Sequence, residues 1–432
     1  MGRARGLDRH AIRGFGPREI GRAAKTGWVL ARGAVQTAAH KPNGMSRREV
    51  GARVLREAFE ELGPTYVKLG QVVASSPLFP DELSAEFQRC LDEVPSFPYE
   101  EVRTVIAEDL GRAPEDLFAW IDPTPLASAS MAQVHAAQTH DGRDVIVKVQ
   151  RPGIRERLES DLRILMRIAY AVDRRSAKGR MANPIVVVDD LAGTLDQELD
   201  FTNEGRAMER YEANLRTFGH NEGVRIPAVY WDLTSPRVIT MERVHGCKID
   251  DVDEVRRLGF DPAEALKSLA RAFMEAAFEH GFFHGDMHAG NLMIDTEGRI
   301  VLLDFGIVGR FHPYTRNLMR EGLLNLFLDG ECETLARGIY QMSPGSREEQ
   351  LEQASLELAR MLEPILAKPL SEMSLGGILV EFINIGALYE LRMPHELVML
   401  VKQLLYVERY IKLMAPEWVM MSDPLMFQFM LS

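Results

Sequence analysis

Residues suited to phosphoryl-transfer chemistry concentrate in one segment of this 432-residue chain, HGDMHAGN at positions 284–291, which is followed by Asp304-Phe305-Gly306. Transfer of a phosphoryl group from a nucleotide needs a carboxylate near the acceptor hydroxyl. It also needs oxygen ligands for the divalent cations that bridge the phosphates. The residue types therefore predict Asp286 as the catalytic carboxylate, and Asn291 and Asp304 as ligands of Mg²⁺.

The spacing of these residues supports the same chemistry. Asn291 follows Asp286 by five residues, and Asp304 follows Asn291 by thirteen, which is the order and spacing found in protein kinases. Ala415-Pro416-Glu417 has the sequence of the APE motif that shapes the peptide-binding segment of protein kinases. It lies 111 residues after Asp304, too far for that role, so we interpret the match as a coincidence. We therefore do not expect an ordinary protein-kinase substrate.

A lysine within an apolar strand pattern lies upstream of this loop. Lys148 interrupts the run 145–149, and a kinase-like enzyme would use it to hold the α and β phosphates of ATP, with an acidic partner on a helix. Glu198 and Glu204 are candidates for this partner. Because they are six residues apart, they lie on different helix faces and cannot both pair with Lys148 in one arrangement.

The loop between the first two predicted strands contains no glycine. It reads Ala127-Ser128-Ala129-Ser130-Met131-Ala132, where a kinase would carry a glycine-rich phosphate-binding loop. Alanine adds a Cβ atom where the backbone should approach phosphate closely. We expect the nucleotide to lie differently from its usual pose in kinases, and the alternative is an inert β-turn.

The elements that must position these residues follow from hydrophobic periodicity. Helical patterns precede residue 111, short strands occupy the middle, and helices dominate from Pro262, apart from a hairpin that leads to Asp304. This order favours an α+β, bilobal architecture. The predicted helices are 47–75, 81–94, 99–110, 155–174 and 184–215, and the predicted strands are 118–121, 132–139, 143–150, 224–231 and 237–244.

Four sequence motifs resemble those of the UbiB family of atypical kinase-like proteins. Lys68-Leu69-Gly70-Gln71 matches the KxGQ motif, the alanine-rich loop replaces the glycine-rich loop, Glu198-x-Asp200 matches ExD, and HGDMHAGN resembles HxDPHPGN. Together they span residues 60–306. The chain departs from the family pattern at Met287 and Ala289, where the family has prolines, and this loosens the loop without removing its ligands.

The resemblance implies a protein-kinase-like fold with a helical N-terminal extension. It makes Glu204 the partner of Lys148, and it directs Glu198 and Asp200 toward the KxGQ helix, where Lys68 and Gln71 would restrain the active site. The hinge between the lobes is expected at 241–244, with Glu242 and Val244 near adenine. The domains expected are a basic leader (1–45), the KxGQ extension (46–114), an N-lobe (115–243) and a helical C-lobe (244–432).

Composition limits the location and the partners of the chain. A net charge of −12 argues against nucleic acid, and three cysteines without metal or disulfide spacing favour a reducing compartment. We expect a cytoplasmic protein, because no signal peptide or membrane-spanning run is evident; the best candidate, Ser374–Tyr389, contains Glu381. Residues 1–50 carry a net +8 and therefore form either a disordered arm or a segment that lies on anionic lipid.

These observations predict an atypical kinase or ATPase that uses ATP and Mg²⁺. The family resemblance implies a role at a membrane in isoprenoid quinone or other lipid metabolism, with proteins of such a quinone or prenyl-lipid pathway as partners. Two alternatives remain open. One is a phosphotransferase acting on small molecules, and the other is a nucleotide-gated scaffold that transfers nothing.

Overall fold

A computed structural model describes most of the chain, which divides into two units. The N-terminal unit comprises residues 1–203 and 229–243, and the C-terminal unit comprises 204–228 and 244–432. The predicted boundary after residue 243 agrees with this division, whereas residues 204–228, assigned to the N-lobe from sequence, cluster with the C-terminal unit. The described residues are 17–39, 46–74, 81–87, 95–175, 184–217, 221–329, 333–343, 346–366, 395–418, 420 and 423–427.

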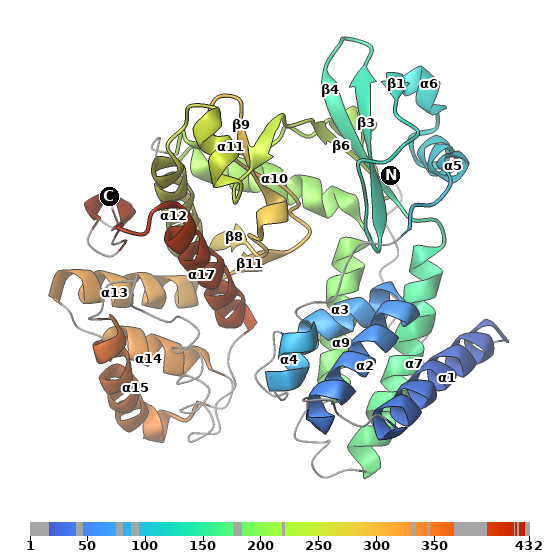
Figure 1. The fold of residues 1–432 in the computed structure, drawn as a ribbon. Helices are drawn as coiled ribbons and strands as arrows, with labels where there is room; N and C mark the ends of the chain where they lie inside the picture. Colours follow the sequence, from blue (N-terminus) through green and yellow to red (C-terminus); the bar gives the residue numbers. More distant parts are fainter. Residues whose placement is uncertain are drawn as a thin grey trace. The chain divides into compact units, whose positions relative to one another are not determined.

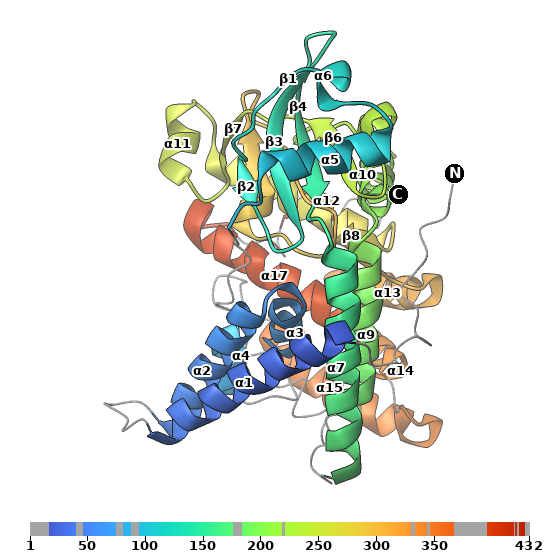
Figure 2. The ribbon, with the colours of Figure 1, turned by 90° about the vertical axis from the view of Figure 1, so that its right-hand side faces the viewer.

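An antiparallel sheet of order β1-β3-β4-β6, with β2 paired to β3, forms one part of the N-terminal unit (Figure 2). Along β4 the side chains of Val145, Val147 and Val149 are buried, and Lys148 lies on the opposite face between Val134 of β3 and Ile239 of β6. The strands predicted over 132–139 and 143–150 are therefore confirmed, and they pair antiparallel as β3 and β4. The strands are β1 (Phe118–Ile121), β2 (Ala127–Ser128), β3 (Ala132–Thr139), β4 (Asp144–Gln150) and β6 (Val238–Glu242).

Helix α5 (Tyr99–Leu110) packs on this sheet, followed by the short α6 (Pro114–Leu117). Val102, Val105 and Ile106 of α5 share a core with the buried valines of β4. The sequence assigned 99–110 to the KxGQ extension, but its apolar face covers the sheet instead. The helical extension therefore ends before α5.

Helices make up the other part of the N-terminal unit, around a core that includes Leu62, Tyr66 and Leu195 (Figure 1). Gly63 breaks the predicted helix 47–75, because its φ of +98° disfavours other residues and a Cβ atom there would lie 2.2 Å from Arg157 Nη2. The helices are α1 (Pro17–Ala39), α2 (Arg47–Leu62), α3 (Pro64–Ala74), α4 (Asp81–Phe87), α7 (Ile154–Arg175) and α9 (Pro184–Glu198).

Part of the basic leader is an ordered helix. Residues 17–39 form α1, which packs against α2 and α7, with Val29 buried and the acid Glu19 nearly so. The prediction of a disordered arm is therefore wrong for this stretch, because Glu19 pairs with Arg163 and Arg22 pairs with Asp161, both on α7. Residues 1–16 and 40–45 lie outside the described part of the chain.

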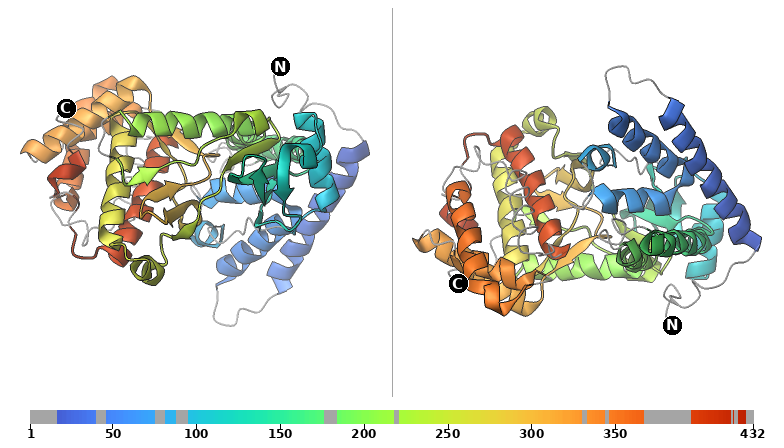
Figure 3. Two further views of the ribbon diagram at one scale, coloured as in Figure 1. Left: turned by 90° about the horizontal axis from the view of Figure 1, so that it is seen from above. Right: turned by 90° about the horizontal axis from the view of Figure 1, so that it is seen from below.

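The C-terminal unit is mainly helical and carries two small sheets, of order β5-β10-β9-β7 and β11-β8. Helix α12 is almost entirely buried, and α17 packs beside it (Figures 1 and 3). The elements are α10 (Phe201–Leu215), β5 (Val224–Arg225), β7 (Gly246–Lys248), α11 (Val252–Arg257), α12 (Pro262–Phe278), β8 (Phe282–His284), β9 (Leu292–Asp295), β10 (Ile300–Leu302), β11 (Val308–Arg310), α13 (Pro313–Asp329), α14 (Glu333–Met342), α15 (Leu351–Leu366) and α17 (His395–Met414).

Two predicted segments differ from the structure in this region. The helix expected over 184–215 is two helices, α9 and α10, separated at Leu199-Asp200, and the strand expected over 224–231 is reduced to Val224–Arg225. Within the described residues, no helix combines the length and the apolar character needed to span a membrane. The candidate span Ser374–Tyr389 lies outside those residues.

Candidate functional site

The predicted catalytic loop connects β8 to β9 in the C-terminal unit. Asn291 Nδ2 donates to the main-chain oxygen of Asp286 over 3.0 Å, so that the amide oxygen of Asn291 is left as the group for a cation. Leu303 N donates to the carbonyl of Asn291 over 2.8 Å, which joins the loop to the residue before Asp304. These two bonds connect the segments that carry Asp286, Asn291 and Asp304, and the catalytic and metal-binding roles of these residues stay predictions.

His284 links the same two segments from inside the protein. Its Nδ1 accepts from Asp286 N over 3.1 Å, and its Nε2 lies 2.9 Å from the carbonyl oxygen of Leu303. The ring therefore carries its proton on Nε2, and complete burial lowers the pKa of His284, against the opposing effect of the Leu303 carbonyl and of the nearby carboxylates of Asp286 and Asp304. His284 is therefore a structural member of the loop.

Asp304 has the φ angle of a left-handed residue, +48°. Asp tolerates this conformation better than most residues, and Asp304 Oδ1 accepts from Gly306 N over 3.1 Å. The neighbouring Phe305 is buried against His284 and Tyr211, with ring centroids at 4.8 and 5.3 Å. Packing of Phe305 thus fixes the backbone that carries the predicted metal ligand, and it explains why α10, which bears Tyr211, belongs to this unit.

Oxygen donors are the ligands that Mg²⁺ prefers, and Asn291 and Asp304 supply an amide and a carboxylate oxygen. The bond from Asn291 Nδ2 to Asp286 O directs the nitrogen of this amide away from a cation. The donor set therefore fits Mg²⁺. A magnesium ion bound here would neutralise charge on the phosphates of a nucleotide.

Helix α17 holds the catalytic loop through residues that sequence reasoning missed. Lys402 Nζ lies 2.9 Å from Asp286 Oδ1. Gln403 accepts from Met287 N over 2.7 Å and donates to Gly285 O over 2.6 Å, and the Tyr410 hydroxyl donates to Met287 O over 2.9 Å. The family pattern has a proline at position 287, and these bonds restrain the loop in its place.

The predicted phosphate-binding lysine lies in the N-terminal unit. Lys148 Nζ is 5.2 Å from the centroid of the Phe201 ring, which follows the ExD motif. Glu204, the partner that the family resemblance implies, belongs to the C-terminal unit. The pairing of Lys148 with Glu204 stays a prediction.

The alanine-rich loop forms a turn in which Ala129 N donates to Ala132 O over 2.8 Å. Arg151 Nη2 holds it from one side, donating to Ser128 Oγ and Ala129 O over 3.1 Å each. Ser130 is buried, and its hydroxyl has no hydrogen-bond partner among the described residues. An orphaned donor in this loop fits a phosphate-contacting role better than that of an inert turn.

The KxGQ and ExD motifs meet within the N-terminal unit. Lys68 of α3 lies 3.1 Å from Glu198 Oε1 at the end of α9, and both side chains are mostly buried. Asp200 caps α10, because its Oδ1 accepts from the backbone nitrogen and the hydroxyl of Thr202. The contact of Glu198 with the KxGQ helix is observed, the capping role of Asp200 was not predicted, and the side chain of Gln71 lies outside the described residues.

The predicted hinge coincides with the boundary between the units. Glu242 ends β6 opposite Val145, and Val244 is the first residue of the C-terminal unit after this strand. The roles of both residues near adenine stay predictions.

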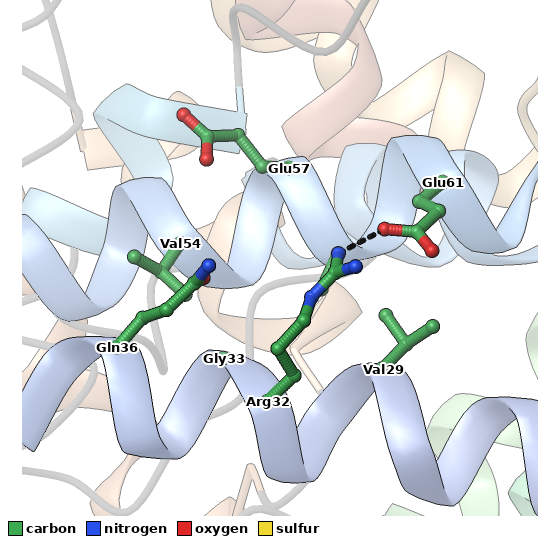
Figure 4. A pocket seen from close by; sticks show the side chains of 8 residues that line it. Val29, Arg32, Gly33, Gln36, Val54, Glu57 and Glu61 are labelled. Atoms are coloured by element: carbon green, nitrogen blue, oxygen red, sulfur yellow. Dashed lines mark hydrogen bonds and ion pairs between the residues drawn. The ribbon is translucent and has the colours of Figure 1, made fainter.

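A separate hollow between α1 and α2, shown in Figure 4, is crossed by an ion pair of Arg32 with Glu61 and contains none of the predicted site residues.

Comparisons with known proteins agree with this arrangement. Residues 89–336 match the model of the ABC1 atypical kinase-like domain, and residues 358–419 match that of the UbiB helical domain. The uncharacterized protein Rv0647c of Mycobacterium tuberculosis is 42% identical over 409 residues, 94% of this chain and 84% of the relative. A probable protein kinase UbiB of Marinobacter nauticus is 34% identical over 361 residues, covering 82% and 65%.

A solved structure shares the fold. The complex of Rv3197 with erythromycin from Mycobacterium tuberculosis matches with a TM-score of 0.52 and 24% identity, over 85% of this chain and 94% of that chain. At this identity the likeness concerns the fold alone. It agrees with the kinase-like architecture that the sequence predicted.

Proposed function

The chain belongs to the UbiB family of ABC1 atypical kinase-like proteins, and we propose that it binds ATP with Mg²⁺ and transfers the γ-phosphoryl group to a hydroxyl acceptor or to water. The bridge through His284 carries this proposal. One buried ring joins Asp286 to the residue before Asp304, so the carboxylate and the predicted metal ligands are held as one rigid group. Such preorganisation is what phosphoryl transfer requires of a protein.

Each predicted residue then has a defined role. Asp286 accepts the proton of the acceptor, Asn291 and Asp304 hold the cation, and Lys148 contacts the α and β phosphates with Glu204 as its partner. Ser130, in the alanine-rich loop, donates its buried hydroxyl toward a phosphate. Lys68 and Glu198 together restrain the KxGQ helix and so regulate access to the site.

The acceptor we propose is not a peptide. Strand β11 pairs with β8 soon after Asp304-Phe305-Gly306, and α13 begins at Pro313, which leaves six residues between Gly306 and that helix. So short a segment offers little backbone for a peptide to lie on. From the resemblance to the UbiB family we further propose a role in isoprenoid quinone or other lipid metabolism, together with proteins of that pathway.

The outer face of α1 supports peripheral association with an anionic membrane. Ile20, Trp28 and Val35 are 59%, 59% and 67% exposed and recur at helical spacing along one side. Lys25 and Arg32, which are also exposed, lie beside this stripe, and the Arg32 guanidinium stacks on Trp28 at 4.7 Å. An apolar stripe beside basic residues is typical of helices that lie in the lipid headgroup region.

The test is release of phosphate from ATP by the full chain, with and without lipid extracts and candidate hydroxyl acceptors. We expect turnover that requires Mg²⁺, and we expect Asp286→Asn and Lys148→Met to lower it by about 100-fold or more. Asp253→Asn, on the exposed face of α11, serves as the control. Equal turnover by wild type and Asp286→Asn would overturn the proposal.

A further inference from the structure

We infer that Lys402 is a catalytic residue, supplied by the helical domain, that binds the transferred phosphoryl group beside Asp286. This inference rests on the proposed function and adds Lys402 to the residues that were assigned a role in the reaction. Lys402 lies on α17, within the UbiB helical domain, 116 residues after Asp286 along the chain. The kinase-like domain thus obtains a cation from outside its own sequence.

The position of the ammonium group is the first argument. Lys402 Nζ lies 2.9 Å from Asp286 Oδ1, and the other carboxylate oxygen of Asp286 lies 3.6 Å from His288 Nε2. The side chain of Lys402 is 40% exposed, so a phosphate can reach its ammonium group. A lysine ammonium carries three donors, and one can stay on Asp286 while another turns to a phosphate oxygen.

The rigidity of α17 against the loop is the second argument. Exposed ion pairs of lysine contribute little when the two side chains can separate. Here the next residue, Gln403, bonds to Gly285 and Met287 on either side of Asp286, and Tyr410, about two turns further on the same helix face, bonds to Met287. These bonds fix the backbone of α17 against the loop, and so they keep Lys402 close to Asp286.

The close approach of α17 to the loop is the third argument. A Cβ atom at Gly285 would lie 2.9 Å from the sulfur of Met399 and 2.7 Å from Ile307, so glycine is needed next to the catalytic carboxylate. Two neighbouring residues of α17 thus make different contacts with the loop: Gln403 is buried, and Lys402 is partly exposed. Gln403 holds the loop, and the part-exposed side chain of Lys402 lies beside Asp286.

The chemistry of the transfer calls for such a cation. The bond between the β,γ-bridging oxygen and the γ-phosphorus breaks, the acceptor oxygen bonds to that phosphorus, the acceptor proton passes to Asp286, and ADP leaves. Negative charge spreads over the three equatorial oxygens during this step. Lys402 would neutralise part of that charge beside Asp286.

Steady-state phosphate release and nucleotide binding by the full chain test the inference. We expect Lys402→Met to lower kcat by about 100-fold, the size of effect typical for one preorganised donor. Its affinity for MgADP should stay within about twofold, while its preference for MgATP over MgADP falls, because the lost contact is to the γ phosphate. Lys402→Arg should recover part of kcat, since the cation is kept.

A matched control is available on the same helix. Lys412 pairs with Glu408 one turn away and touches none of the loop residues, so Lys412→Met should leave kcat and both affinities unchanged. Circular dichroism and thermal unfolding of Lys402→Met should match the wild type. A purely structural role would instead lower stability and both nucleotide affinities together, and Lys402→Arg would not restore kcat; that pattern overturns the inference.

The two proposals can fail separately. If the wild type releases phosphate and Lys402→Met does so equally fast with an unchanged preference for MgATP, the role of Lys402 is wrong and the proposed function stands. If the wild type binds MgATP without turnover under any condition, phosphoryl transfer is wrong. The preference for MgATP over MgADP then still decides whether Lys402 contacts the γ phosphate.

Discussion

Arg22 of α1 and Asp161 of α7 form a two-point ion pair, with Nε and Nη2 at 2.5 and 2.8 Å from the two carboxylate oxygens. Asp161 is fully buried and also accepts from Thr65 Oγ1, three residues before Lys68. Arg22 Nη2 donates further to Leu62 O, at the end of α2. The first described helix therefore helps to place the helix that carries the KxGQ motif.

Arg22→Met should lower the free energy of unfolding by about 3–5 kcal/mol, because it leaves the buried carboxylate of Asp161 without its cation. Urea denaturation measures this. Arg32→Met, which removes a half-exposed cation from the same helix, is the control and should cost about 1 kcal/mol or less. Equal losses for the two variants would mean that the Asp161 pair contributes no more than a surface contact.

Lys68 and Glu198 should show a coupling free energy of about 1–3 kcal/mol in a double-mutant cycle with Lys68→Met and Glu198→Gln. Both side chains are mostly buried, so water screens their attraction weakly. The exposed pair Arg32–Glu61 is a suitable reference and should couple by less than about 1 kcal/mol. Additive effects at Lys68 and Glu198 would rule out the restraint that we assign to this pair.

Asp304→Asn should abolish the stabilisation that MgATP confers in thermal unfolding. Asparagine tolerates the left-handed backbone at this position, so the fold should survive while the cation loses its carboxylate. Wild type with ATP and a chelator provides the reference. A variant that keeps the full magnesium-dependent shift would exclude Asp304 as a ligand.

The stability of the protein should fall on acidification through His284. Its pKa is lowered in the folded state by burial, although the carboxylates of Asp286 and Asp304 oppose this. Below about pH 6.5 the unfolded chain therefore binds a proton that the folded chain refuses, and the free energy of unfolding drops by up to about 1.4 kcal/mol per pH unit. Denaturation between pH 5 and 7 measures the slope, and His284→Gln should flatten it. An equal slope in both proteins would assign the effect to other groups.

Replacing Ile20, Trp28 and Val35 together by serine should weaken binding to anionic vesicles by about tenfold or more, since each inserted side chain contributes about 1.5–3 kcal/mol. Binding of the wild type should also weaken with salt, because the basic flanks are screened over about 8–10 Å. Co-sedimentation with vesicles tests both effects. Leu126→Ser, which alters an exposed leucine outside α1, is the control. Unchanged binding by the triple variant would remove α1 from the lipid surface.

Local patterns predicted the parts of the site that a short stretch of chain determines. The hairpin of β9 and β10 brings Asn291 beside Leu303, the residue before Asp304, and the alternating valines around Lys148 identified its strand. The KxGQ helix and Glu198 were matched only through family resemblance, since 130 residues separate Lys68 from Glu198. No spacing rule relates residues so far apart.

Long-range packing accounts for what the sequence did not predict. Lys402 and Gln403 lie in an ordinary amphipathic helix, and nothing in their neighbourhood distinguishes them from Lys412. Helix α1 is held by the ion pair of Arg22 with Asp161. Asp161 is one of many charged residues in α7, and nothing in the sequence of α7 shows that it is the buried one. Gly63, with a φ of +98°, ends α2 and Pro64 begins α3, so a local Gly-Pro pair breaks the helix within a continuous apolar period.

The bonds from α17 to the catalytic loop also set an order of events during synthesis. At about 5–20 residues per second, a ribosome needs roughly 6–23 s to translate the 116 residues between Asp286 and Lys402. During that interval Met287 lacks its partners on Gln403 and Tyr410, and Asp286 lacks its lysine. The catalytic loop consequently gains its bonds to Gln403 and Tyr410 only after the helical domain has been synthesised.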